Sequence, residues 1–89
     1  MNCYIVAFRT LNEVSRNRVR EVLKTYSSYC PIHNYCWAVR TAEKATQLRD
    51  KVKNVLSPNE NVFVIRSGTE AAWFNSYGEK NNEWLREHL

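Results

Sequence analysis

The chain has 89 residues, a formal net charge of +4, and three Trp, five Tyr and three Phe residues. This length allows one domain, which we take to span residues 1–89, because domains usually have about 100–200 residues. The apolar share of 44 %, with only two Gly and two Pro, excludes disordered, collagen-like and low-complexity chains. The basic excess is compatible with a polyanionic partner.

The charge is unevenly distributed along the chain. Residues 1–66 hold eleven basic and five acidic side chains, whereas residues 67–89 hold two and four. The longest uncharged run, residues 1–8, is far shorter than the roughly 20 apolar residues of a membrane-spanning helix, and no signal-peptide cleavage pattern follows it. The three cysteines form no disulfide pattern. We therefore expect a cytoplasmic protein with free thiols and no membrane partner.

The N-terminal part predicts a strand followed by a helix. Residues 3–8 are almost wholly apolar and rich in strand-forming residues, which is typical of an interior strand. Thr10 and Glu13 form a possible capping box, with Asn12 as a rival cap. Apolar side chains at helical spacing then predict a helix over residues 13–26.

A hairpin is predicted next. Residues 29–32 and 35–40 are strand-like runs on either side of a two-residue turn at positions 33–34. Pro31 has no backbone N–H to donate, so the first arm is expected to be an edge strand or to carry a bulge.

The second half predicts a helix, a strand and a final helix. Thr41 is the expected N-cap of the first of these helices, and the segment 57–59 with its proline ends it. Its apolar stripe is formed by Ala45, Leu48, Val52, Val55 and Leu56. Residues 62–65 are predicted to form a buried strand. A possible capping box at 76–79 precedes the last helix, which should turn Trp84, Leu85 and Leu89 inward.

The order strand, helix, strand, strand, helix, strand is that of a ferredoxin-like βαββαβ sandwich of the α+β class. Such a fold has a four-stranded antiparallel sheet with two helices on one face, and here an extra C-terminal helix follows. The first and third strands are central in this arrangement, in agreement with the apolar character of residues 3–8 and 35–39.

A family resemblance rests on the stretch from residue 35 to the end. Its parts are Trp37 in a strand, the helical segment 47–51, the strand 61–66, the segment Gly68-Thr-Glu-Ala-Ala-Trp73 and the terminal Glu83-Trp-Leu. This pattern resembles the small bacterial and phage proteins of the SinR family. These look like relatives of the CRISPR-associated integration adaptor, the ferredoxin-like partner of the spacer integrase. The resemblance covers roughly residues 2–89.

The resemblance implies a homodimer, because in the adaptor family the segment after the fourth strand crosses to the partner subunit. Trp73 and Phe74 are the residues that we assign to this interface. At one place the chain differs from the family that it resembles. Nuclease-active relatives carry an Asp at the end of the first strand, where a pair of such residues would hold a divalent cation, but this chain has Arg9 near that place. Its single Asp is Asp50, in the second predicted helix.

Two motifs have a chemical and a purely structural interpretation. Cys30, His33 and Cys36 are soft ligands across one predicted hairpin, suited to Zn²⁺ or, less well, to nucleophilic catalysis. The simpler interpretation is two buried thiols and a turn histidine, and we expect no bound metal or cofactor. The three Trp residues are able to stack on bases, although packing in a core or dimer interface explains them as well.

Basic residues are the candidate ligand-binding set. Arg9, Arg16, Arg20, Lys24 and Arg40 are the residues that we expect to contact phosphates of DNA or RNA. Arg9 and Arg40 are expected at adjacent strand ends, converging with Arg16. The sequence thus favours a non-enzymatic homodimer with a basic face that contacts nucleic acid without sequence preference. A protein–protein interaction module (an inhibitor, an antitoxin-like partner or an assembly adaptor) is the alternative, and a degenerate metal-dependent nuclease is the third hypothesis.

Overall fold

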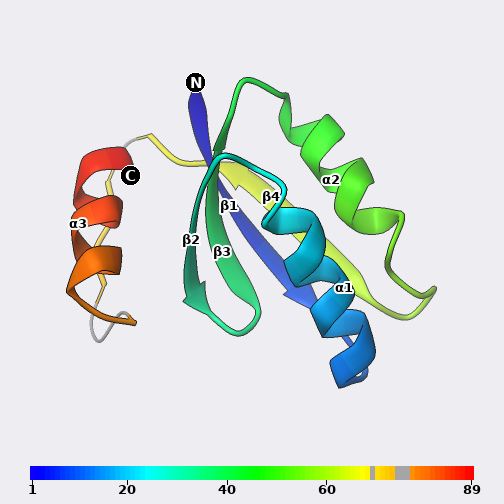
Figure 1. The fold of residues 1–89 in the computed structure, drawn as a ribbon. Coiled ribbons are helices and arrows are strands. Elements are labelled where there is room, and N and C mark those ends of the chain that lie inside the picture. The colour runs from blue at the N-terminus through cyan, green and yellow to red at the C-terminus, as the bar shows by residue number, and fades with distance from the viewer. Residues whose placement is uncertain (69, 74–76) are drawn as a thin grey trace.

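The structure is a computed structural model that describes residues 1–68, 70–73 and 77–89. Its elements are β1 (Asn2–Arg9), α1 (Glu13–Leu23), β2 (Ser28–His33), β3 (Cys36–Thr41), α2 (Ala45–Lys53), β4 (Asn61–Arg66) and α3 (Glu79–His88). The strands form one antiparallel sheet in the order β2-β3-β1-β4. Helices α1 and α2 lie on one face of the sheet and α3 lies on the other (Figure 1). This confirms a ferredoxin-like α+β fold with an extra C-terminal helix.

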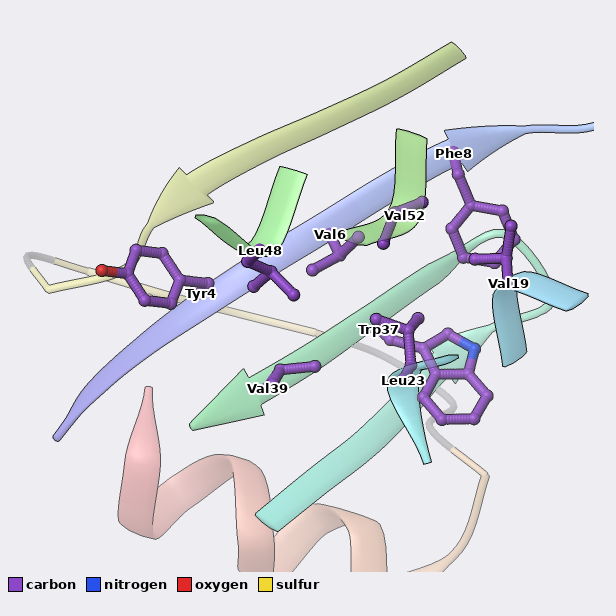
Figure 2. Close-up of a cluster of buried hydrophobic side chains, with 9 residues drawn as sticks. All are labelled: Tyr4, Val6, Phe8, Val19, Leu23, Trp37, Val39, Leu48 and Val52. Atoms are coloured by element: carbon purple, nitrogen blue, oxygen red, sulfur yellow. The ribbon is translucent and has the colours of Figure 1, made fainter. Parts of the chain in front are cut away.

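The main core lies between the sheet and helices α1 and α2. Alternate residues of β1 point to opposite faces, so Tyr4, Val6 and Phe8 face the two helices. The remaining members of the main core are Val19 and Leu23 of α1, Trp37 and Val39 of β3, and Leu48 and Val52 of α2 (Figure 2). The apolar stripes predicted for both helices are therefore confirmed.

A second, smaller core lies on the opposite face of the sheet, under α3. It contains Cys3, Cys30, Ala38 and Leu85, with Ile5, Ile32, Trp73, Trp84 and Leu89 packed against it. The inward direction predicted for the apolar residues of the last helix is confirmed. Helix α3 contacts β2, so it covers the β2 side of this face and leaves the β4 side open.

Side-chain caps differ from the sequence prediction at both helix starts. Asn12, rather than Thr10, caps α1, because its Oδ1 accepts a hydrogen bond of 2.9 Å from the backbone N–H of Ser15. Thr41 is the last residue of β3, and its hydroxyl accepts from the N–H of Glu43 instead of capping α2. The predicted capping box at 76–79 includes Ser76, which lies outside the described residues.

Both long helices are shorter than predicted. Helix α1 ends at Leu23, three residues before the expected end. Tyr26 therefore lies beyond the helix, and its hydroxyl donates to Glu43 in the connection between β3 and α2. Helix α2 ends at Lys53 and is followed by turns that bring Val55 and Leu56 against the main core. The periodicity continued beyond each helix because apolar turn residues also pack inward.

The two edge strands differ in how they are protected. Strand β2 carries Pro31 and a register irregularity between Pro31 and His33, as predicted. Strand β4 was expected to be buried, and this is wrong: β4 is the other edge, and Phe63 and Ile65 are 63 % and 52 % exposed. An apolar run does not distinguish a central, buried strand from an edge strand that has apolar side chains on an exposed face.

A buried carboxylate joins the two loops at one end of the sheet. Glu60 accepts hydrogen bonds from the backbone N–H groups of Leu11, at 2.8 Å, and Ser57, at 2.6 Å. These backbone hydrogen bonds lower the pKa of Glu60.

Among the described residues, no helix combines the length and apolar character needed to cross a membrane.

Candidate nucleic-acid interface

Three cations form a stripe along α1. Arg16, Arg20 and Lys24 are four residues apart, so they project from one side of the helix, and this set is called the α1 stripe below. Their ion pairs within the helix are long and exposed: 3.5 Å from Arg16 to Glu13 and 3.8 Å from Lys24 to Glu21. Exposed pairs of this kind contribute little, about 0–1 kcal/mol, so the cations remain available to a ligand.

One aromatic residue, Trp37, lies beneath Arg20 of the stripe. The guanidinium carbon of Arg20 lies 6.0 Å from the ring centroid of Trp37, which is 2 % exposed. The Nε atoms of Arg16 and Arg20 are buried and lack a hydrogen-bond partner in the described part of the chain. A guanidinium presents its donors in a planar fork that matches a phosphate. The stems of both arginines are thus packed, and their heads are held beside the main core.

The two remaining candidate cations lie elsewhere. Arg40 pairs with Cys3 and Arg9 pairs with Asn61, so the antiparallel register puts them at opposite ends of β1, about 20 Å apart. Alternation in β3 directs Arg40 away from α1 and α2, and Arg9 donates to the carbonyl of Asn59 at 3.0 Å. The expected convergence of Arg9 and Arg40 with Arg16 is therefore wrong, because it assumed the wrong pairing of strand ends.

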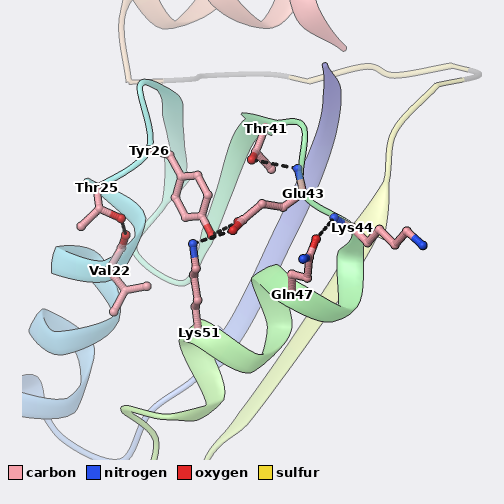
Figure 3. A network of polar contacts seen from close by, with 8 residues as sticks. All are labelled: Val22, Thr25, Tyr26, Thr41, Glu43, Lys44, Gln47 and Lys51. Carbon is pink, nitrogen blue, oxygen red and sulfur yellow. Dashed lines mark hydrogen bonds and ion pairs between the residues drawn. The ribbon is translucent and has the colours of Figure 1, made fainter.

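A polar network closes the end of the main core beside α2. Glu43 accepts hydrogen bonds from the hydroxyl of Tyr26 and the ammonium of Lys51 (Figure 3). The backbone carbonyl of Glu43 accepts another, of 2.8 Å, from the hydroxyl of Tyr4. Lys51, and after it Tyr26, lower the pKa of Glu43. Burial and the bond to Glu43 raise the pKa of Tyr26. The hydroxyl of Tyr26, the carboxylate of Glu43 and the ammonium of Lys51 are thus hydrogen-bonded to one another. The network links the segment after α1 and the segment after β3 to helix α2, which indicates a structural role.

Replacing Glu43 by Gln is expected to destabilise the protein by about 1 kcal/mol at pH 7, because the charged acceptor of two hydrogen bonds is lost. The pKa of Glu43 in the folded state lies below its usual 4.5. The ionised carboxylate therefore stabilises the fold above that pH, and this contribution disappears as the pH falls through the lowered value. Urea unfolding of both proteins should show a difference in stability at pH 7 that narrows as the pH falls below 4.5.

Glu13→Gln is the control for this effect, since the interaction of Glu13 with Arg16 is a long, exposed ion pair of 3.5 Å. It should leave the stability at pH 7 almost unchanged. A difference between Glu43→Gln and the wild type that does not narrow at any pH below 4.5 would contradict the assignment.

The three cysteines and His33 form no reactive arrangement with one another or with the other described residues. Burial raises the pKa of Cys3, Cys30 and Cys36, which favours the thiol over the nucleophilic thiolate. The Nδ1 of His33 accepts a hydrogen bond of 3.1 Å from the N–H of Tyr35, as a turn residue does. No group of three or more His, Cys, Asp or Glu side chains that could hold a metal ion occurs in residues 1–68, 70–73 and 77–89.

The predicted dimer residues have different positions. Phe74 lies outside the described residues. Trp73 is half-buried against the second core of its own chain, and its Nε1 donates to Oδ1 of Asn82 at 3.0 Å. Beside it, Ile5, Ile65, Ala72 and other residues line an open groove of about 530 Å³ between β4 and α3. The interface role of Trp73 and Phe74 stays a prediction.

One residue of the site was not singled out from the sequence. Tyr29 stacks on Trp37, with 5.4 Å between ring centroids and 27° between ring planes, and is 36 % exposed. The signal that could have found it is its position two residues before Pro31 on the predicted edge strand. Alternation places Tyr29 and Pro31 on the same face of β2. This strand is at the edge of the sheet, so no further strand lies beside it.

The comparisons with known proteins bear on the fold. No protein-family model matches the chain, and no curated protein matches it. A solved structure that is similar is the crystal structure of a hypothetical protein, TT1823, from Thermus thermophilus. The match has a TM-score of 0.69 at 14 % sequence identity and covers 83 % of this chain and 90 % of that one. At this identity the likeness supports the fold alone.

Proposed function

We propose that this protein is a non-enzymatic, homodimeric binding protein of the cytoplasm that contacts nucleic acid without reading its sequence. The observation that carries the proposal is the α1 stripe: three cations on one side of a helix, whose ion pairs with Glu13 and Glu21 are long and weak. Phosphate binding by such groups is electrostatic and independent of base identity. The cytoplasmic location is supported by the three free cysteines.

The proposal that the protein is not an enzyme is supported by the residue at the end of β1. Nuclease-active members of the family that the sequence resembles carry a metal-binding Asp at the end of the first strand, whereas this chain has Arg9 near that place, where it donates to the carbonyl of Asn59. A cationic side chain opposes the binding of a second cation at the same place. Incubating the protein with labelled DNA and RNA in Mg²⁺ or Mn²⁺ should leave the strands intact, and metal-dependent cleavage would favour the nuclease hypothesis instead.

Neutralising two cations of the α1 stripe tests the binding proposal. We expect Arg16→Gln combined with Arg20→Gln to weaken binding to a labelled oligonucleotide at least about tenfold at low salt. The slope of log K against log salt should also become shallower by about 1.5–2, because two phosphate contacts are lost. Fluorescence anisotropy over a salt series measures both quantities.

A matched control exists on α2. Arg49→Gln combined with Lys53→Gln removes the same charge from residues at the same spacing, on another helix. This variant should retain most of the affinity and the slope. Equal losses in the two variants would show that net charge alone attracts the ligand, and absence of salt-sensitive binding in the wild-type protein would refute the proposed function.

Homodimer formation is the second part of the proposal. Phe63 and Ile65 of β4 are exposed apolar side chains next to the open groove beside α3. Contiguous exposed apolar surface is typical of interaction sites, and a two-fold axis brings the same patch of two copies together. A second copy would cover the half of the sheet that α3 leaves open. A different protein on this face is the alternative, favoured by the same groove if the purified protein is a monomer.

A further inference from the structure

Tyr29 presents an aromatic ring to solvent beside the α1 stripe. Its ring packs on the indole of Trp37, with centroids 5.4 Å apart, yet 36 % of the residue is exposed. Trp37 itself is buried, so it provides no surface for a ligand. One face of the tyrosine ring is covered by Trp37, so a ligand would contact the part of Tyr29 that stays exposed. Tyr29 is thus a supported ring that is free to stack once more.

Arg20 lies over the same indole as Tyr29. The guanidinium carbon is 6.0 Å from the Trp37 centroid, and the Nε of Arg20 has no hydrogen-bond partner in the described part of the chain. Trp37 therefore contacts both a cation of the α1 stripe and an aromatic ring that is large enough for a base to stack on. A nucleotide combines the two complementary groups, a flat base and an adjoining phosphate.

A second exposed ring lies at the hairpin end of the same region. Tyr35 is 42 % exposed and packs edge-to-face on Phe8, with 6.0 Å between centroids. Since Phe8 belongs to the main core, the ring of Tyr35 borders the side of the sheet that carries α1. Tyr35 lies in the turn between β2 and β3, and its carbonyl accepts a hydrogen bond of 2.9 Å from the N–H of Phe8, so this second ring lies over the end of β1 and not at the β2 edge.

We propose that the ligand of the α1 stripe is a single-stranded nucleic acid, with one base stacked on Tyr29 and adjoining phosphates held by Arg16 and Arg20. This inference rests on the proposed nucleic-acid function and adds the strand state of the ligand. In a duplex each base is already stacked on its neighbours and offers no face to a protein ring, whereas an unpaired strand offers one at every base. Stacking is tolerant of base identity, which agrees with binding independent of sequence.

The test compares strand states and aromatic variants at one salt concentration. Anisotropy titrations would use labelled oligo-dT, oligo-rU and a DNA duplex of equal length. The wild-type protein should bind at least one single strand more tightly than the duplex. Tyr29→Leu, which keeps an apolar cover over Trp37, should weaken single-strand binding by about 5- to 100-fold. It should leave duplex affinity and the salt slope unchanged, because no phosphate contact is lost.

Tyr29→Phe is the matched control, since it retains the ring and removes only the hydroxyl, and it should bind like the wild type. Melting curves would show that each variant is folded. The stacking proposal would be overturned if the wild type bound single strands no more tightly than the duplex, or if Tyr29→Leu bound single strands as tightly as the wild type. Salt-sensitive binding in either case would still support the basic interface. If no nucleic acid binds at low salt, the proposed function and this inference fail together.

Discussion

Replacing Trp37 by Ala is expected to lower the free energy of unfolding by about 3–5 kcal/mol. The indole is the largest fully buried side chain and joins β3 to Val19 and Leu23 of α1. Truncation leaves a cavity and removes the support of Tyr29 and Arg20. Since domains of this size have a total stability of about 5–15 kcal/mol, the variant should be marginally folded at room temperature. Urea denaturation followed by circular dichroism measures the loss.

Trp84→Ala provides the comparison. Trp84 is only partly buried, packs against the second core and makes an edge-to-face contact with His88 at 4.7 Å. Its loss should destabilise the protein by less than half as much as the loss of Trp37. Equal effects of the two substitutions would mean that the sheet face under α3 contributes as much stability as the main core.

The Phe63→Glu variant is expected to convert a dimer into a monomer. Phe63 is 63 % exposed on the isolated chain, so a charged replacement leaves the folded monomer intact. In a two-fold interface each copy would bury one Glu against apolar surface, and burial of an unpaired carboxylate is strongly unfavourable. Light scattering after size exclusion should give twice the 10.5 kDa chain mass for the wild type and one chain mass for the variant.

Val14→Glu is matched to this change, because Val14 is 61 % exposed and lies on α1. It introduces the same charge at the same exposure and should remain a dimer. A dimer that persists in Phe63→Glu would place the interface elsewhere. A wild-type monomer would leave the open groove to a different protein, as the interaction-module hypothesis holds.

The order of the elements and the choice of central strands followed from local patterns. The uninterrupted apolar run of residues 3–8, the hairpin interrupted by Pro31 and two amphipathic helices are compatible with few topologies. The boundaries were harder to predict. Asn12 and Thr10 are both good caps, and the choice between them depends on which hydroxyl or amide reaches Ser15 once β1 has ended.

The candidate site was predictable in its cations and not in its aromatic part. Spacing of four residues placed Arg16, Arg20 and Lys24 on one side of a helix. The contacts of Trp37 with Tyr29 and Arg20 join three elements, and no local pattern contains them. Arg40 was excluded from the stripe by strand register, which is a long-range property: a shift of one residue would have turned it to the other face.

The sequence by itself determined the ferredoxin-like element order, the composition of the main core and the basic side of α1, because these depend on hydrophobic period and charge spacing within single elements. Only the tertiary structure decided that β4 is an exposed edge, that Arg9 and Arg40 lie at opposite ends of the sheet, and that Tyr29 and Arg20 share one buried indole. These depend on which residues distant in the chain become neighbours, and such contacts form only when the whole sheet has paired and packed.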